Sequence, residues 1–333
     1  MKVLYAIQGT GNGHLCRAMD VVPCLQEVAQ VDILLSGTQA DIHLPFDVKF
    51  RYKGLSFIFG KSGGVDLWKT FVNSRFRSFI KEVNACPVNE YDLVINDFEP
   101  VSAWACNLKD IPYINLSHQA AAIHSQAPKP EEADRVGKFI LEHYAPSNKS
   151  YGFHFKSYSP NFYTPVIRKQ VREQAVSNDG HYTVYLPSYD DHLLISYLSR
   201  FPEVRWDVYS KHNKGVIIEG NVKVQPIDNE NFIKSMATCE GMLCGAGFET
   251  PAEALFLKKK LLVIPMKNQY EQHLNAAALE QLGVPVIKNI KPENDVKIRD
   301  WINTKQVVNV KYENQIKEIV DKIMNDYRSS LSL

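Results

Sequence analysis

Three glycines followed by a histidine stand near the start of the chain, in the stretch YAIQGTGNGHLCRAMDVV at residues 5–22. The apolar residues before Gly9 predict a buried strand, and a helical pattern begins at His14, so Gly9, Gly11 and Gly13 lie at a strand–helix junction. Such a junction can bind an anion, because unpaired backbone N–H groups and the positive end of the helix dipole converge there. Because a histidine side chain titrates near neutral pH, His14 could be a general base, or it could simply face solvent at the helix start.

The glycine loop departs from the known phosphate-loop fingerprints. A dinucleotide-binding loop needs GxGxxG or GxGxxA, with a carboxylate about 20 residues later at the end of the next strand. Here His14 occupies the third small position, and the next predicted strand ends in Ser36 and Gly37 without an acid. Neither GKS nor GKT follows, so the loop is not a Walker A motif. We therefore predict that the glycines admit an acceptor molecule and that His14 presents its imidazole to it.

Two acidic residues follow a later buried strand, in the stretch YDLVINDFEPVSAW. Asp97 or Glu99 could orient the imidazole of His14, as a carboxylate partner does in catalytic pairs. The structural alternative is that Asp97 caps the helix that begins near Val101, where Glu99 would be favoured by the helix dipole. His118, which follows the next predicted strand, could line the same cleft or be structural.

The second half of the chain carries another strand–turn–helix stretch, CEGMLCGAGFETPAEALFLKK. Gly245, Ala246 and Gly247 form its turn, whose N–H groups, together with the following helix start, could hold a diphosphate. Thr250 and Glu253 have the spacing of a capping box, with Thr250 as N-cap and a proline at the first helical position. Glu253 therefore has a structural explanation, and it could also accept hydrogen bonds from both ribose hydroxyls of a nucleotide.

Amides and carboxylates cluster after the next predicted strand, in the stretch VIPMKNQYEQHLNAA. Glu271 and Gln272 would suit a polyhydroxyl ligand, whose paired hydroxyl groups need bidentate acceptors and donors. The alternative is an ordinary solvated helix start.

These motifs resemble those of the GT-B nucleotide-sugar glycosyltransferases, in particular the peptidoglycan N-acetylglucosaminyltransferase group and its UDP-glycosyltransferase cousins. The resemblance rests on GxGxGH and on the later run of GAGFETPAEAL, a proline-ended strand and EQxxNA. It implies that a sugar is transferred from a nucleoside diphosphate, with UDP as the expected carrier, to an acceptor hydroxyl that His14 activates.

The resemblance also implies positions for the parts of the donor. The diphosphate would bind at residues 245–247 and the following helix start, and the ribose at Glu253. The transferred sugar would contact Glu271 and Gln272, with Asn275 close behind.

Two further donor contacts are implied in the second half. The loop around Ile227 resembles the one that receives the nucleotide base, and Ser188 falls where the first loop of the second domain nears the phosphates. The chain departs from the family there, with LPSYDD in place of the usual glycine-rich turn.

The resemblance bears on the course of the reaction as well. Retaining enzymes of this fold often show an ExxxxxxxE pair in the donor region, but Gly245 stands eight positions before Glu253, so we expect inversion. No DxD-like pair accompanies the donor motifs, so we expect no metal and no cofactor, with the nucleotide sugar as co-substrate. Two alternatives use the same site: a nucleotide-sugar 2-epimerase or hydrolase, and a non-catalytic nucleotide-sugar binding protein.

The pattern between these motifs predicts two α/β domains. Short apolar runs alternate with stretches of helical period, which is typical of parallel sheets covered by helices on both faces. A loop-rich segment at residues 145–180 separates the two halves. We expect Rossmann-like, doubly wound domains at residues 1–160 and 161–333 that face each other across a cleft. A C-terminal amphipathic helix at residues 312–327 should pack on one of them.

Composition argues against several classes of protein and site. With 38 basic and 37 acidic residues, the chain lacks the basic excess that nucleic-acid binding usually requires. Its six cysteines form no CxxC pair, so we predict neither a zinc site nor a disulfide framework. We see no leader sequence and no apolar run of about 20 residues, and we therefore expect a cytoplasmic protein.

One stretch, DLWKTFVNSRFRSFIKE at residues 66–82, mixes aromatic and basic residues. As a helix it could touch the cytoplasmic face of a membrane and meet a lipid- or glycan-linked acceptor of the cell envelope. The interpretation that we favour is an ordinary amphipathic helix with a solvated basic face. The acceptor, the sugar and the oligomeric state do not follow from the sequence.

Overall fold

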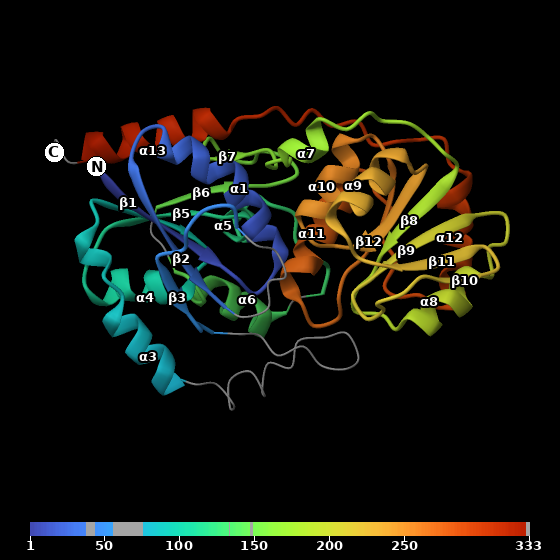
Figure 1. Cartoon of the computed structure of the whole chain (residues 1–333), viewed down its shortest axis with the longest axis horizontal. Helices are drawn as coiled ribbons and strands as arrows, with labels where there is room; N and C mark the ends of the chain where they lie inside the picture. Colours follow the sequence, from blue (N-terminus) through green and yellow to red (C-terminus); the bar gives the residue numbers. More distant parts are fainter. Residues whose placement is uncertain (38–43, 56–75, 133, 147–148, 331–333) are drawn as a thin grey trace.

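Two α/β units lie side by side in the computed structural model, each with a sheet between layers of helices (Figure 1). The structure describes residues 1–37, 44–55, 76–132, 134–146 and 149–330. The first part of the aromatic and basic stretch, residues 66–75, lies outside the described residues.

The first unit is built on a parallel sheet whose described strands lie in the order β3-β2-β1-β4-β5-β6-β7. These strands are β1 (Lys2–Gln8), β2 (Gln30–Ser36), β3 (Phe50–Tyr52), β4 (Leu93–Asp97), β5 (Tyr113–Leu116), β6 (Ser150–Phe153) and β7 (Phe162–Tyr163). Side chains of β1 alternate between two cores, with Val3, Tyr5 and Ile7 in one and Leu4 and Ala6 in the other. Because both faces of the sheet are buried, the strand is apolar along most of its length.

The second unit has a sheet whose described strands lie in the order β10-β11-β9-β8-β12-β13. These strands are β8 (His181–Tyr185), β9 (Arg205–Ser210), β10 (Ile217–Glu219), β11 (Val222–Pro226), β12 (Gly241–Gly245) and β13 (Lys260–Ile264). All described pairings are parallel except that of β10 with β11. One face of this sheet packs around the buried indoles of Trp206 and Trp301.

Helices follow the strands in both units. In the described part of the chain they are α1 (Asn12–Gln26), α3 (Phe76–Ala85), α4 (Pro100–Leu108), α5 (His118–Ala122), α6 (Arg135–His143), α7 (Lys169–Arg172), α8 (Asp191–Leu198), α9 (Asn229–Thr238), α10 (Glu249–Phe256), α11 (Tyr270–Gln281), α12 (Asp295–Asn303) and α13 (Ile316–Ser330), with short 3-10 turns at Val88–Glu90 and Pro292–Asn294. None of the described helices is long and apolar enough to cross a membrane.

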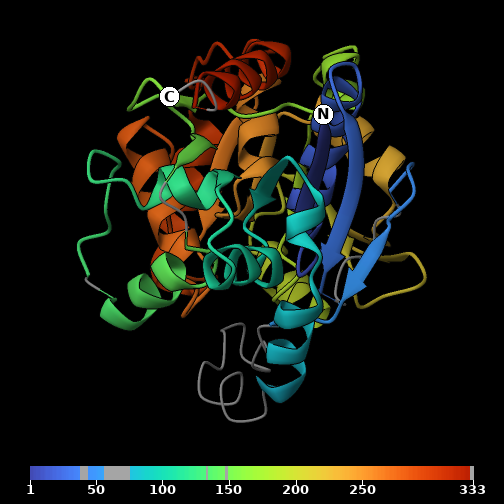
Figure 2. The same ribbon diagram turned by 90° about the vertical axis from the view of Figure 1, so that its left-hand side faces the viewer.

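The boundary between the units differs from the one expected at residue 160. β7 pairs with β6 as the edge strand of the first sheet, so the first unit continues beyond that residue. The last helix, α13, also returns to the first unit, where it lies along α1 (Figures 1 and 2). Its residues Ile319, Val320 and Ile323 are buried in the same core as α1. The first unit therefore includes the C-terminal helix as well as the N-terminal part of the chain.

The expected doubly wound architecture is confirmed, and it brings the two glycine turns together. Gly13 follows β1, and a Cβ atom built on it would lie 2.4 Å from a carboxylate oxygen of Glu249, which follows β12. The carboxyl ends of the two sheets therefore face each other. The segment at 145–180, expected to be loop, contains β6, β7 and α7; these elements are two to four residues long, too short for a periodic signal.

Candidate active site

His14 and Asp97 form a close pair at the carboxyl end of the first sheet. β1 and β4 are neighbours, with Ile7 opposite Asp97 in register, so the segments that follow these strands start side by side. α1 begins at Asn12, directly after the glycine turn, which puts His14 in its first turn. The Nδ1 atom of His14 lies 2.8 Å from Oδ1 of Asp97.

This contact fixes the tautomer of the imidazole. An ionised Asp97 can only accept, so Nδ1 of His14 carries the proton and donates it to the carboxylate. Nε2 is left as a hydrogen-bond acceptor, with the side-chain amide nitrogen of Gln119 3.4 Å away. The His14 side chain is 13% exposed, so it is accessible at the edge of the site. An imidazole in this tautomer can take up a proton at Nε2.

Arg17 holds Asp97 as well, next to His14. Its guanidinium donates two hydrogen bonds to the carboxylate, from Nε to Oδ2 at 3.0 Å and from Nη2 to Oδ1 at 2.7 Å. Both side chains are buried. Burial alone would raise the pKa of the Asp97 carboxyl, but Arg17 and His14 outweigh burial and lower that pKa below its ordinary value. Asp97 is therefore ionised at neutral pH and can stabilise an imidazolium.

Glu99 is placed at a helix cap and not beside His14. Its carboxylate accepts hydrogen bonds from the backbone N–H groups of Val101 and Ser102, at 2.7 and 2.6 Å. Glu99 is thus the N-cap of α4, and its burial raises the pKa of its carboxyl group. Asp97, which the sequence left open as a cap, is instead the partner of His14. Phe98 separates the two acids in a left-handed conformation, with a φ of 56°.

The three glycines of the first turn have different surroundings. A Cβ on Gly9 would come within 3.0 Å of the backbone oxygen of Ser36, and a Cβ on Gly13 would meet the carboxylate of Glu249. A Cβ on Gly11 would have no heavy atom within 4 Å. The expectation that all three admit an acceptor therefore needs correction: Gly9 and Gly13 have close protein neighbours, and Gly11 alone borders open space.

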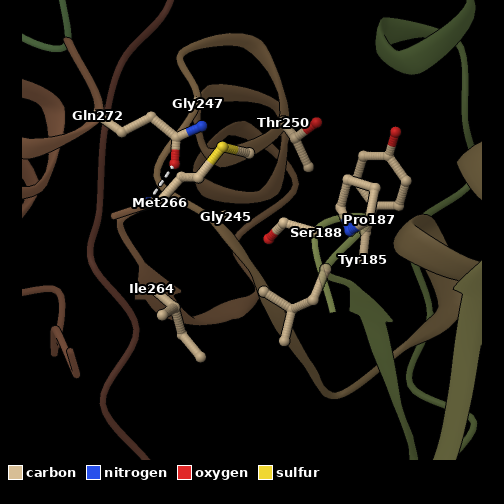
Figure 3. Close-up of a pocket in the computed structure, with 10 residues that line it drawn as sticks. Tyr185, Pro187, Ser188, Gly245, Gly247, Thr250, Ile264, Met266 and Gln272 are labelled. Atoms are coloured by element: carbon tan, nitrogen blue, oxygen red, sulfur yellow. Dashed lines mark hydrogen bonds between the residues drawn. The ribbon is translucent and has the colours of Figure 1, made fainter. Parts of the chain in front are cut away.

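A pocket lies at the carboxyl end of the second sheet (Figure 3). It unites four of the donor residues expected from the sequence, namely Ser188, Gly245, Gly247 and Gln272. Thr250 and Met266 lie beside them, and the side-chain oxygen of Gln272 accepts a 2.8 Å hydrogen bond from the backbone N–H of Met266. The lining thus joins a glycine turn, a helix start and hydroxyl groups.

The helix after the glycine turn starts earlier than the expected capping box. α10 begins at Glu249, and its N-cap position, Phe248, supplies no side-chain hydrogen bond. Thr250 therefore lies inside the first turn, and its side chain lines the pocket instead of capping the helix. Ala246 is buried, with its N–H donated to the carbonyl of Ile264 at 3.2 Å.

Glu253 has a protein partner that the sequence did not suggest. Arg168 donates to both of its carboxylate oxygens, from Nε at 2.6 Å and from Nη2 at 2.7 Å. Glu253 is 1% exposed and does not line the pocket among the residues described there. A ribose at this carboxylate would have to share it with Arg168.

Asn275 and His118 link the two units instead of lining the pocket. The Nε2 atom of His118 lies 2.6 Å from Oδ1 of Asn275, and the amide nitrogen of Asn275 donates to the carbonyl of Ala246 at 3.1 Å. The His118 ring stacks on Phe248, with 3.7 Å between ring centroids. Burial lowers the pKa of His118, and its other ring nitrogen, Nδ1, lies 2.8 Å from the carbonyl oxygen of Phe153. These contacts favour the structural alternative for His118.

Two remaining expected contacts, Glu271 and Ile227, are not among the described residues that line the pocket. Glu271 is in the first turn of α11, next to Gln272 in sequence. Ile227 follows β11, and its backbone N–H donates to the carbonyl of Ser210 at 2.9 Å. Among the described residues, no group of three or more His, Cys, Asp or Glu side chains could hold a metal ion.

Four polar residues of the site were missed from the sequence: Arg17, Gln119, Arg168 and Glu249. Arg17 could have been found, because it stands three residues after His14 and so shares its helix face. Glu249 gave no such signal, because its partner Arg17 lies 232 positions away in the chain.

Comparisons with known proteins identify the family and the fold of the chain. The sequence matches the model of glycosyl transferase family 1 over residues 1–304. No curated protein matches it significantly. The structure is similar to MurG of Acinetobacter baumannii, with a TM-score of 0.57 and 16% identity over 97% of this chain and 99% of that one.

Two further solved structures have the same arrangement of domains. UGT89C1 of Arabidopsis thaliana, complexed with quercetin, has a TM-score of 0.61 and 12% identity over 98% of this chain and 94% of that one. The glycosyltransferase SnogD of Streptomyces nogalater has a TM-score of 0.55 and 14% identity over 98% and 95%. The chain therefore belongs to glycosyl transferase family 1 and is a glycosyltransferase of the GT-B fold.

Proposed function

We propose that the enzyme transfers a sugar from a nucleoside diphosphate, with UDP as the carrier, to a hydroxyl group of an acceptor. The observation that carries the proposal is the His14–Asp97 pair at the carboxyl end of the first sheet, together with the pocket at the carboxyl end of the second sheet. Glu249, which is bound to Arg17 next to this pair, directly precedes Thr250 of the pocket. A base on one side and an anion-binding turn on the other suit transfer from a diphosphate to an alcohol.

The donor would occupy the pocket and its surroundings. The backbone N–H of Gly247 and those at the start of α10 would receive the diphosphate, since the N–H of Ala246 is already donated to the carbonyl of Ile264. The hydroxyls of Ser188 and Thr250 would lie beside it. The sugar would contact Glu271 and Gln272. UGT89C1 has been solved complexed with UDP, which supports UDP as the carrier.

The rest of the nucleotide would extend away from this point. Its ribose would lie at Glu253, where it shares the carboxylate with Arg168, and its base would lie at the loop around Ile227. Both placements come from the family resemblance, and the hydrogen bond of Ile227 to Ser210 orders that loop.

The transfer step follows from the tautomer of His14. Nε2 takes the proton of the acceptor hydroxyl while its oxygen attacks the anomeric carbon from the side opposite the diphosphate. The bond from that carbon to the diphosphate oxygen breaks, so the configuration inverts, and UDP leaves with the bonding electron pair. The helix start and the turn N–H groups stabilise the charge on the leaving diphosphate, so the proposal requires neither a metal nor a cofactor.

We place the enzyme in the cytoplasm. The first class of acceptor to be tested is a lipid- or glycan-linked molecule of the cell envelope, which the enzyme would meet at the cytoplasmic face of the membrane. Phe76 and Ile80 on α3 are 59% and 41% exposed, which supports such a contact. UGT89C1 has been solved in complex with quercetin, so small hydroxyl-bearing acceptors form the second class.

The experiment is a panel of nucleotide sugars with and without acceptors. Thermal shift first identifies the donor, because a ligand that binds only the folded state raises its stability. Release of UDP is then measured with each acceptor class, in buffer with and without EDTA, and NMR of the product gives its anomeric configuration. Acceptor-dependent UDP release with inversion supports the proposal. Epimer or free sugar formed without an acceptor would instead identify an epimerase or a hydrolase, and binding without any turnover a sensor.

A further inference from the structure

We propose that Glu249, a residue of the donor domain, sets the strength of the His14 base through Arg17. Glu249 reaches Arg17 from the donor domain, so part of the charge around the base comes from the opposite unit. This inference rests on the proposed role of His14, and it adds a positioning residue to that role.

The geometry places Arg17 between the base pair and the opposite domain. Its Nη1 donates to Oε1 of Glu249 at 2.6 Å, while its Nε and Nη2 hold Asp97 at 3.0 and 2.7 Å. Nη2 also lies 2.9 Å from Nδ1 of His14. Both atoms are donors in the assigned tautomer, so this contact is a crowded one and not a hydrogen bond. Two carboxylates and the imidazole therefore meet around one guanidinium.

Counting charges shows what Glu249 contributes. Arg17 is always positively charged, because its guanidinium cannot lose its proton. Without Glu249, this positive charge would cancel the negative charge of Asp97, which a protonated His14 needs for its own stabilisation. Glu249 supplies a second negative charge, so the cluster is neutral after His14 has taken up a proton. The Arg17 side chain is 2% exposed and that of Glu249 is 24% exposed, so water screens the cluster only in part.

Gly13 provides a second and independent observation. A Cβ at this position would lie 2.4 Å from Oε2 and 2.7 Å from Cδ of Glu249. Any larger residue there would displace the carboxylate that reaches Arg17. The third glycine of GxGxGH thus makes room for Glu249, a role that the sequence alone did not indicate.

The position of Glu249 on α10 fits the same role. It is the first residue of the helix whose start would receive the donor diphosphate. A free carboxylate there would repel that diphosphate, and the ion pair with Arg17 neutralises it. Contact between the domains thus prepares the donor site and the base together.

Each helix or strand that packs against His14 contributes a charged, titratable or polar side chain. Arg17 shares α1 with it, Asp97 ends β4, and Glu249 begins α10. Tyr5 of β1 donates to Oδ2 of Asp97 at 3.5 Å, and burial raises its pKa well above the ordinary value, so it stays neutral. From α5 the neighbour is the neutral amide of Gln119. Glu249 is therefore the charged neighbour that the donor domain supplies.

The test is NMR titration of the His14 ring in the free full-length protein, with the signal assigned by its loss in His14→Gln. Glu249→Gln keeps a hydrogen-bond acceptor for Arg17 but removes the charge. One charge at roughly 8 Å, in a medium of effective dielectric constant about 20 to 40, shifts a titration by about one pH unit. We expect the midpoint of Glu249→Gln to lie lower by about that amount, because the imidazolium loses its neutralising charge.

The matched control is Glu203→Gln, which removes the carboxylate of an exposed pair with Arg299, 2.9 Å apart. Its midpoint should equal that of the wild type. An unchanged midpoint in Glu249→Gln overturns the inference. Circular dichroism and urea unfolding will check that Glu249→Gln is folded. Glu249→Asp keeps the negative charge, so its His14 midpoint should lie close to that of the wild type.

Kinetics separate this inference from the proposed function. If the enzyme is a transferase, Glu249→Gln should move the acid limb of the kcat/KM profile to lower pH and reduce kcat several-fold. If no transfer is detected but the His14 midpoint shifts as predicted, the proposed function is refuted and the charge coupling is supported. Transfer with a wild-type pH profile in Glu249→Gln would refute the coupling and keep the proposed function.

Discussion

Replacing Asp97 by Asn should damage both the activity and the stability of the enzyme. Asp97 is fully buried and is bound by the guanidinium of Arg17 and the imidazole of His14. Removing one partner of a buried ion pair costs about 3–5 kcal/mol, because the other charge stays buried. Arg17 keeps Glu249 as a partner, so we expect the free energy of unfolding to fall by about 3 kcal/mol, at the lower end of that range.

The effect on turnover has a separate cause. In Asp97→Asn the side chain is no longer a pure acceptor, so it no longer fixes the proton of His14 on Nδ1. In the Ser-His-Asp triad the same change lowers kcat about 10⁴-fold. We expect a loss of about 10²–10⁴-fold here, because Arg17 remains and continues to order the surrounding groups.

Urea unfolding and single-turnover transfer, measured on the same preparation, test both effects. His14→Gln is the control, because it removes the base without leaving a buried charge; it should lose as much activity but less than about 1 kcal/mol of stability. If Asp97→Asn loses stability yet transfers within tenfold of the wild-type rate, Asp97 serves only Arg17, and the base pair has been misassigned.

Two more predictions concern positions outside the base pair. Gly13→Ala should lower the NMR titration midpoint of His14 as Glu249→Gln does, because its Cβ displaces the Glu249 carboxylate; Gly11→Ala, which meets no atom within 4 Å, should leave the midpoint unchanged. Burial lowers the pKa of His154 to about 2, so as pH falls below about 6.5 the unfolded chain takes up a proton that the folded chain refuses. This residue should therefore cost about 2 kcal/mol of stability between pH 7 and pH 5. Urea unfolding of His154→Phe should show a pH dependence weaker by that amount, and an equal dependence would contradict the burial argument.

The sequence predicted the architecture well, because its signals are local. A strand buried on both faces, such as β1, is an apolar run, and the glycine turns after β1 and β12 stand out by composition. The same locality explains the failures. β7 has two residues and gave no periodic signal, so the domain boundary fell too early.

The candidate site was predictable only in part, for the same physical reason. Ser188, Gly245, Gly247 and Gln272 follow strands of one sheet, and parallel strands bring their carboxyl ends together. Contacts between the domains left no such pattern. The sequence therefore could not choose between Asp97 and Glu99 as the partner of His14, nor could it reveal Glu249.

Binding and transfer measured together in His14→Ala test the central claim most directly. Calorimetry gives the Kd for UDP, and a single-turnover assay with the donor and acceptor found in the panel gives the rate of transfer. We predict an unchanged Kd, because the donor lies in the other domain, and a rate reduced by about 10²–10⁴-fold, because general-base catalysis is lost. Transfer at the wild-type rate, or loss of UDP binding with the rate, would contradict this prediction.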